Sequence, residues 1–424
     1  MKIIRKRARA IVNKKTIKTK KVVRKIKRIS PKRIKTIKKI VSPAKPVKKR
    51  KKRTSTEMIP LRSRIRRLNK RTILIEPEPA ENGLLLPNKK ILHLPSDPAG
   101  QMSTQASTLR KLGVAANFCT FVQRKYGYAN GIVSPIKNVP DSKRGHAMMR
   151  FTTNAARAYD IFHFHAGQTC TRYNYRDLPY LKKQKKKLVM TYWGSEARRL
   201  SIALKNNSFA RVKQILKEKD IVSMLNFITA YTDAVIVSDY ELYESLKGFC
   251  NKVYLIRIAV DHRNIIPYYP SETKKIPLIV HAPTDRYLKG TDNVISAIKR
   301  LRAYATFEYV QVENMTNAQA LEWIKKADIV IDQVRLGIYA TLSIESMLMG
   351  KPVVAYIRDD LIRKYPEGLP IVSANPLTLE NKLYELIQSP SLRYELGVKG
   401  REYAEINHDP ERIARQLITI YRSL

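Results

Sequence analysis

The feature that most constrains the fold is a repeated unit: a short apolar run ends in a polar loop, and a helical pattern follows. Alternating strands and helices of this kind predict parallel sheets with helices on both faces. Ligands of such sheets bind beyond the carboxyl ends of the strands. The units begin with the segments 89–95, 114–122, 159–167, 186–196, 232–248 and 252–261, and then with 276–283, 307–312, 328–333, 352–356 and 369–372.

These units predict an α/β protein with two Rossmann-like domains that face a cleft, since 424 residues are too many for one core. The stretch EPEPAENG is typical of a linker, and HRNIIPYYPSETKK, which has no period, is typical of a hinge. Asp409 and Pro410 open an amphipathic helix, as a cap and a first-position proline. We predict a basic tail at 1–72, a linker at 73–88, a first domain at 89–261, a hinge at 262–275, a second domain at 276–407 and, at 408–424, a helix that crosses back to the first domain.

Basic residues concentrate in the tail, which holds 32 Lys and Arg against one acid, Glu57. Ile and Val recur there at helical spacing, and prolines interrupt the pattern, so we expect a disordered or partly helical segment. Three interpretations stay open. The tail lies on an anionic membrane surface, binds nucleic acid or another polyanion, or is solvated without a fixed partner.

Three widely spaced cysteines, Cys119, Cys170 and Cys250, predict no disulfide framework and suit a reducing compartment. No run approaches the roughly 18 apolar residues of a membrane span. The N-terminus also lacks the apolar core of a secretory signal. We therefore expect a cytoplasmic protein without a transmembrane helix. The first interpretation of the tail would place it at the periphery of a membrane.

The loop HAPTDRYLKGTDN leaves a strand and enters a helix. Arg286, Lys289 and the amides near Gly290 and Thr291 would converge where unpaired N–H groups and the helix dipole favour a phosphate. The alternative is an ordinary strand–helix turn with two solvated cations.

The segment GIYATLS opens a second helix, whose single charge is Glu345. Its small residues let backbone amides approach a ligand, and Glu345 could reach a ribose hydroxyl beside phosphates. The alternative is a carboxylate stabilised by its helix N-terminus. Two anion-ready loops in one domain favour a nucleoside diphosphate over either loop alone.

His163 and His165 alternate along one strand, so their side chains share a face. Such a pair can bind a metal, but only Asp160 lies near in sequence and no third ligand is evident. We expect one hydrogen-bonded and one site-facing histidine, and no metal. Trp193, at the end of the next strand, packs against a sugar or caps the core.

The order of these segments resembles the retaining GT-B glycosyltransferases of family 4, also called glycosyltransferase group 1, over nearly all of 89–424. ADIVIDQVRLGIYATLSIESMLMGKPVVAY resembles the donor-binding segment of that family, and HAPTDRYLKGTDNVISAI its phosphate loop. YDIFHFHAG, YWGSEARR and AGQ resemble its acceptor-side loops. The resemblance implies a nucleotide-sugar donor on the second domain and an acceptor on the first. It also implies retention by front-face attack, without a protein nucleophile, a metal or another cofactor.

Glu345 matches the second glutamate of the family's Glu-x7-Glu motif, which implies a ribose contact, and Lys289 matches the lysine that contacts the diphosphate. Gly337 stands in place of the first glutamate, and Thr284 in place of the usual phosphate arginine. We expect catalytic roles for His165, Trp193, Arg286 and Lys289, donor contacts from Gly290, Thr291, Tyr339, Ala340, Thr341, Leu342 and Glu345, and acceptor-side contacts from Gly100, Gln101, Gly194, Ser195 and Glu196.

The leading hypothesis is a glycosyltransferase with an unknown acceptor, which the positive charge suits if that acceptor is acidic or associated with the cell envelope. A second hypothesis is a GT-B scaffold or binding protein without turnover, which the missing first glutamate favours. A third is a nucleic-acid protein that acts through its tail. No Gly-x-Gly-x-x-Gly follows a strand, which argues against a nicotinamide dehydrogenase.

Overall fold

The computed structural model describes residues 71–81, 83, 86, 88–121, 132–133, 136, 139–172, 174–213 and 216–424. The predicted basic tail lies outside these residues except for its last two, so its conformation stays a prediction. None of the described helices is both long enough and apolar enough to cross a bilayer.

The first sheet has eight strands in the order β1-β8-β7-β6-β5-β2-β3-β4, and all neighbours are parallel. Its central strands are fully buried because helices cover both faces, which explains their continuous apolar runs. The strands are β1 (Ile73–Ile75), β2 (Ile91–Leu94), β3 (Ala116–Thr120), β4 (Ile132–Val133), β5 (Ile161–His165), β6 (Lys187–Tyr192), β7 (Ala234–Val237) and β8 (Lys252–Leu255).

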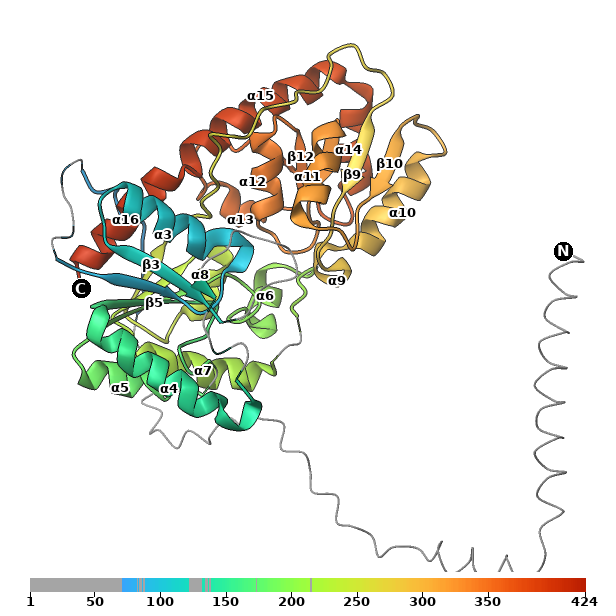
Figure 1. Ribbon diagram of the computed structural model, residues 1–424. Helices are drawn as coiled ribbons and strands as arrows, with labels where there is room; N and C mark the ends of the chain where they lie inside the picture. The colour runs from blue at the N-terminus through green and yellow to red at the C-terminus, as the bar shows by residue number, and fades with distance from the viewer. Residues whose placement is uncertain are drawn as a thin grey trace, which may run out of the picture. The chain divides into compact units, whose positions relative to one another are not determined.

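Successive residues of these strands point to opposite faces of the sheet. Leu92 and Leu188 belong to one core with α4, α5 and α7, whereas Ile91 and Val189 belong to another with α3 and α16. Figure 1 shows these two groups of helices on opposite sides of the sheet. The helices that precede the hinge are η1 (Pro98–Gly100), α3 (Gln101–Lys111), α4 (Asp141–Ala158), α5 (Asp177–Lys183), α6 (Leu200–Asn206), α7 (Glu218–Tyr231) and α8 (Tyr240–Leu246).

The second sheet has five parallel strands in the order β10-β9-β11-β12-β13. Helices α10 and α14 pack on one of its faces, and α11 packs on the other. Its strands are β9 (Leu278–His281), β10 (Glu308–Gln311), β11 (Ile329–Ile331), β12 (Val353–Ala355) and β13 (Val372–Ser373). Its helices are α9 (Arg286–Lys289), α10 (Thr291–Leu301), α11 (Asn317–Lys326), α12 (Thr341–Leu348), α13 (Asp359–Ile362), α14 (Leu379–Gln388) and α15 (Pro390–Asn407). The segment 262–275, which joins the two halves of the fold, contains no helix or strand.

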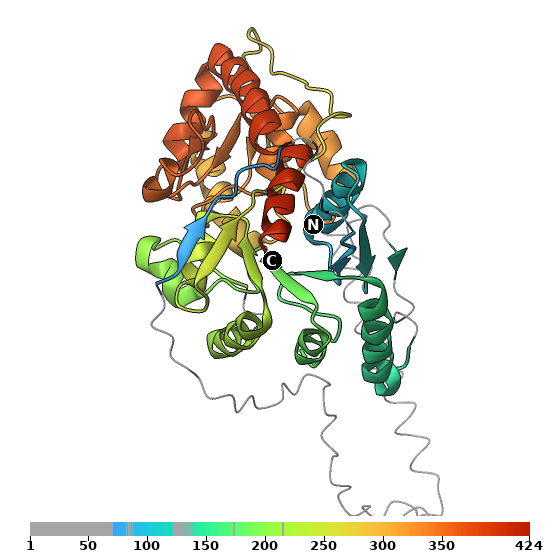
Figure 2. The same ribbon diagram turned by 90° about the vertical axis from the view of Figure 1, so that its left-hand side faces the viewer.

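The last helix, α16 (Pro410–Arg422), packs on the first sheet rather than the second. Figure 2 shows it beside the strands of that sheet, with β1 in blue next to β8. Gln416 Nε2 donates to Pro77 O at 2.8 Å, and Thr419 Oγ1 donates to Glu78 O at 2.7 Å. The linker predicted at 73–88 therefore contains an edge strand, and its backbone is bonded to the C-terminal helix.

Candidate functional site

A cavity of about 250 Å³ lies between the carboxyl ends of the two sheets. Gly100 and Gln101 line it from the first half, and Asn317, Thr341 and Glu345 line it from the second. Parallel strands place all of these loops and helix starts at the facing edges. The structure thus brings two of the predicted acceptor-side residues against two of the predicted donor residues.

The side-chain amide of Gln101 is bonded to the backbone of Ala259, so it is not free to bind a ligand. Its Nε2 donates to Ala259 O and its Oε1 accepts from Ala259 N, both at 2.8 Å, and the side chain is buried. Gly100, with φ of 72°, turns the chain directly before α3. Asp97 Oδ1 accepts from Met102 N at 2.8 Å and so fixes the start of the same helix. These contacts therefore fix the start of α3 at this side of the cavity.

Glu345 lies in the second turn of α12 and is 9% exposed. Its Oε1 accepts a hydrogen bond from Asn317 Nδ2 at 3.2 Å. Burial raises the pKa of Glu345 to about 7, and the nearby Asp332 charge adds to this, while Asn317 opposes it. The carboxyl group is thus close to half-ionised near neutral pH and has an acceptor oxygen for a hydroxyl group.

Lys289, at the end of α9, pairs with the fully buried Asp332, which follows β11. Ser343 Oγ donates to the other carboxylate oxygen of Asp332 at 2.6 Å. Burial alone would raise the pKa of Asp332, but the Lys289 charge and the hydrogen bonds from Lys289 and Ser343 hold it below its usual value. The predicted diphosphate lysine is therefore oriented by an acid that the sequence motifs did not reveal.

The other residues of this loop differ from Lys289 in their burial and in their bonding partners. Arg286 is 48% exposed on its side chain and pairs with Glu313 at 2.9 Å and Asp292 at 3.4 Å, so it does not point freely into the cavity. Thr291 is buried, and its Oγ1 bonds to His281 Nε2 at 3.0 Å. Gly290 has φ of +76° and separates α9 from α10, which leaves the α10 N-terminus next to Lys289.

Gly337 occupies the position of the missing glutamate, and its surroundings exclude a side chain. A Cβ atom there would lie 2.6 Å from Arg358 Cγ, and the φ of +80° is one that L-residues rarely adopt. Arg358 is 1% exposed and pairs with Glu244 of α8 at 2.9 Å and with Asp360 at 2.6 Å. The stem of an arginine thus fills the place of the absent carboxylate side chain.

The remaining residues of the predicted donor loop divide between core and cavity. Tyr339 is buried, and its hydroxyl bonds to His408 Nε2 at 3.1 Å, so its side chain does not reach a donor as predicted. Leu342 packs on the α11 core of the second sheet. Ala340 is the N-terminal cap position of α12, and Thr341 lines the cavity.

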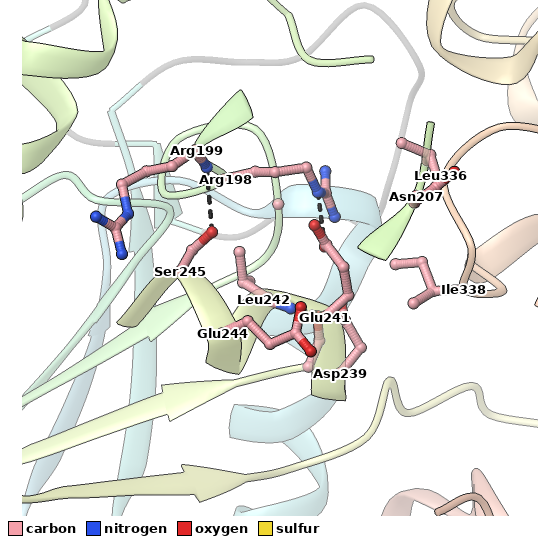
Figure 3. Close-up of polar contacts among 12 residues, drawn as sticks. Arg198, Arg199, Asn207, Asp239, Glu241, Leu242, Glu244, Ser245, Leu336 and Ile338 are labelled. Carbon is pink, nitrogen blue, oxygen red and sulfur yellow. Dashed lines mark hydrogen bonds and ion pairs between the residues drawn. The ribbon is translucent and has the colours of Figure 1, made fainter. Parts of the chain in front are cut away.

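On the acceptor side, the loop after β6 is held by its own glutamate. Glu196 Oε1 accepts hydrogen bonds from the backbone N–H groups of Trp193 and Gly194. Arg198 follows and forms a buried pair with Glu241 at 2.7 Å (Figure 3). Ser195 lies within this loop, half-buried. Glu196 therefore stabilises the loop and uses one carboxylate oxygen for that purpose.

Two polar contacts tie the loop after β11 to the first half. Figure 3 shows Asn207 beside Leu336 and Ile338 of the loop that follows β11. Asn207 Nδ2 donates to Arg335 O at 2.7 Å, which ties the end of α6 to that loop. Together with the ion pair between Arg358 and Glu244, this bond fixes the loop that carries Gly337 against the first half.

His163 and His165 are joined by a third histidine, His93 of β2, and all three are fully buried on the face that α16 covers. Trp193 Nε1 donates to His165 Nδ1 at 3.2 Å, and His165 Nε2 bonds to His93 Nδ1 at 3.1 Å. Tyr421 OH lies 3.3 Å from His93 Nε2 and 2.6 Å from His163 Nδ1. His165 thus has both ring nitrogens in hydrogen bonds and no exposed surface, so this structure presents no free ring nitrogen for the catalytic role predicted for it.

The protonation and hydrogen bonds of these three histidines matter for whether they could hold a metal ion. Burial is the main cause that lowers the pKa of each of the three histidines, to about 3 for His93, so all are neutral. The indole N–H of Trp193 can only donate a hydrogen bond. It therefore decides which atom is the donor in every later bond of the chain, which runs through His165, His93, Tyr421 and His163 to Thr191. One ring nitrogen of each of the three histidines lies within 4.8 Å of the other two. The third ligand that the sequence did not reveal is therefore present, and in this structure the ring nitrogens bond to one another and to Trp193, Tyr421 and Thr191.

Residues that the sequence motifs missed include Asn317, Asp332, His93 and Arg358. Asp332 carried a signal, since it is the acid directly after an apolar strand. His93 carried a signal too, because it stands between two apolar residues of its strand, as His163 does. The contacts of Asn317 and Arg358 depend on tertiary structure and left no local pattern.

No protein-family model matches the sequence, and no curated protein sequence is significantly similar to it. Solved structures are similar in fold. The sucrose-phosphate synthase of Thermosynechococcus elongatus has a TM-score of 0.56 and 16% identity, covering 79% of this chain and 99% of that one. Anabaena HepE in complex with UDP-glucose has a TM-score of 0.54 and 12% identity, covering 79% of this chain and all of that one (100%). The glycosyltransferase of Rickettsia africae ESF-5 has a TM-score of 0.52 and 15% identity, covering 79% and 98%.

At these identities the likeness shows the fold. The chain has the GT-B architecture of two parallel-sheet α/β domains, which confirms the predicted fold class.

Alanine at Gly337 should cost more stability than alanine at Gly368. Gly368 has φ of +78° and no atom within 4 Å of an ideal Cβ, so its replacement costs only the left-handed backbone, about 1–2 kcal/mol. The contact with Arg358 adds about 1–3 kcal/mol at Gly337. Urea unfolding of the two variants measures the difference. Equal losses would contradict the close packing described here.

Glu345→Gln should remove a pH dependence of stability. The folded-state pKa of Glu345 is raised by burial to about 7 from the ordinary 4.5, so the native state binds this proton more tightly than the unfolded chain. The wild-type chain therefore loses stability relative to the variant as the pH rises from about 4.5 to 7, by up to about 3 kcal/mol. Unfolding free energies measured across this range test the shift. Parallel pH profiles for the two proteins would refute it.

Proposed function

We propose that the chain is a glycosyltransferase that moves a sugar from a nucleoside-diphosphate sugar to an acceptor held by the first half. One observation carries the proposal. The cavity between the two sheets has Glu345 on its wall, on the helix whose Ser343 holds the acid that orients Lys289. The predicted ribose contact, Glu345, and Ser343, which anchors the predicted diphosphate lysine through Asp332, thus lie on one helix, α12.

The neighbouring folds support the donor class. HepE is described in complex with UDP-glucose and with UDP and glucose, and the trehalose-6-phosphate synthase structure concerns glycosyltransfer with retention. The trehalose-6-phosphate synthase structure has a TM-score of 0.54 with this chain at 9% identity. We extend both features to this chain as proposals: a uridine diphosphate sugar as the first donor to test, and retention as the stereochemical course.

Each residue then has a physical task. Glu345 accepts a hydrogen bond from a ribose hydroxyl, and Lys289 and the N–H groups at the start of α10 stabilise charge that develops on the leaving diphosphate. Lys289 can donate three hydrogen bonds, so it keeps Asp332 while it binds a phosphate oxygen. The acceptor attacks from the same face as the leaving group, and neither a protein nucleophile nor a metal is required. Trp193 and the loop that Glu196 holds face the acceptor, which is acidic or envelope-associated.

The second candidate function is binding without turnover. Gly337 supplies no carboxylate, and Arg358 fills the space, so the sugar lacks one contact that the resemblance implies. Donor hydrolysis separates the two candidates. Nucleotide binding without hydrolysis or transfer supports the scaffold.

Lys289→Ala and Glu345→Ala should each weaken binding of uridine diphosphate, as measured by calorimetry. Loss of a charge-assisted contact of about 1.5–3 kcal/mol corresponds to roughly 10- to 150-fold. Lys299→Ala, an exposed lysine at the other end of α10, is the matched control and should leave binding unchanged. Wild-type affinity in both site variants would contradict the assignment of Lys289 and Glu345 to the donor site.

We propose in addition that the basic tail binds an anionic membrane or another polyanion, on the strength of its 32 basic residues. The full chain should sediment with vesicles that contain anionic lipid, less so at high salt, and a chain without residues 1–70 should not. A duplex DNA of the same charge concentration distinguishes nucleic acid as the target. Identical behaviour of the two chains in both assays means a solvated tail without a partner.

A further inference from the structure

Five basic side chains gather where the phosphate loop of the second half meets a loop of the first half. Three of them have a carboxylate within 4.0 Å: Lys213 with Asp285, Arg286 with Glu313, and Lys289 with Asp332. The other two are Arg211 and Arg335. Among the residues that the structure describes, neither has a carboxylate partner at that distance, and the nearby Asp292 charge only partly offsets the burial of Arg335 and the Arg211 charge that act on its pKa.

Arg335 is held in a fixed orientation. Its Nε donates to Asn293 Oδ1 at 2.9 Å, its Nη1 donates to Tyr287 O at 2.8 Å, and its guanidinium lies 5.9 Å from the centre of the Tyr287 ring. Its Cγ would be 3.1 Å from a Cβ on Gly290. The side chain therefore lies directly over the junction of α9 and α10, beside the helix N-terminus that follows Lys289.

The loop that carries Arg211 reaches the same place from the first half, since its Lys213 lies 3.5 Å from Asp285. The loop after α6 bonds to the second half through Asn207 and Arg335 O, and Phe209 packs edge-on against Tyr356 with ring centres 6.0 Å apart. Arg211 Nη1 donates to Ala210 O at 2.7 Å, which folds the side chain along its own loop. Burial, together with the Arg211 charge, lowers the pKa of Arg335, in keeping with two cations that repel each other.

Two half-buried guanidinium groups whose charges act on each other, and neither of which is paired with a carboxylate, repel each other, and an anion bound between them would offset that repulsion. The planar donor set of arginine matches a phosphate group, which accepts two hydrogen bonds from each fork. The adjacent N-terminus of α10 adds a favourable dipole.

We infer that Arg211 and Arg335 form an anion site that spans the two halves of the fold and binds a phosphate group of a substrate. This inference rests on the proposed function and deepens it. Arg335 supplies a second phosphate cation, which the motif position Thr284 does not, and it acts together with Lys289. Because one arginine comes from each half, the phosphate binds fully only when both halves are in place.

Two sources of phosphate are consistent with this chemistry: the donor diphosphate and a phosphate on the acceptor. The position of Arg335 over Gly290 favours the donor. Calorimetry with uridine diphosphate and with uridine isolates the phosphate contribution, since both ligands share the nucleoside. Binding of inorganic phosphate, measured with uridine diphosphate at saturation, reports the acceptor side.

Arg335→Ala and Arg211→Ala should each weaken uridine diphosphate binding at least tenfold and leave uridine binding unchanged. Arg335→Lys, which keeps the charge and loses the fork, should fall between the wild type and the alanine variant. Arg302→Ala, an exposed arginine just beyond α10, is the control and should alter neither ligand. Circular dichroism of each variant confirms that it is folded.

The outcomes separate this site from the proposed function. If only phosphate binding in the presence of the nucleotide is lost, the anion site stands and belongs to the acceptor. If both arginine variants bind both ligands like the wild type while Lys289→Ala does not, the anion site is wrong and the proposed function survives. If the wild-type chain binds neither ligand, both fall.

Discussion

The common direction of all strands in both sheets is the constraint on which the candidate site depends. Carboxyl ends of parallel strands lie at one edge, so the loops after β2, β6, β9 and β11 can all open onto the same interface. The site therefore needs no long-range pattern in the sequence beyond the order of its strand–helix units. A chain with one antiparallel strand among these would send that loop to the opposite edge.

Charges buried near this interface are each balanced in a different way. Asp332 has Lys289 and Ser343, and Arg358 has two carboxylates, so both stay ionised with low residual cost. Glu345 has only the amide of Asn317 and is consequently driven toward its neutral form. The least compensated acid is thus the one that lines the cavity. That combination is typical of groups that meet a ligand.

The architecture was largely readable from the sequence, because β5, β6, β9, β11 and β12 are apolar runs bounded by loop residues. The edge strand β1 was not, since three residues next to prolines and acids give no period. At the site, Glu345 and Lys289 followed from motif and spacing, but their partners did not, because Asn317 and Asp332 come from other elements.

His165 shows what the alternation of residues along a strand cannot predict. Alternation correctly put His163 and His165 on one face, but it could not say that α16 covers that face. Similarly, Gly337 could be recognised as a departure from the motif, while the reason for it, Arg358, depends on packing between segments.

Photoaffinity labelling with an azido derivative of uridine diphosphate, followed by peptide mapping, tests the central claim most directly. The account predicts that the label is found on the peptides around 281–293 and 337–349, and that excess unmodified uridine diphosphate prevents it. Labelling confined to other parts of the chain, or labelling that the unmodified nucleotide does not displace, would contradict a donor site between the two sheets.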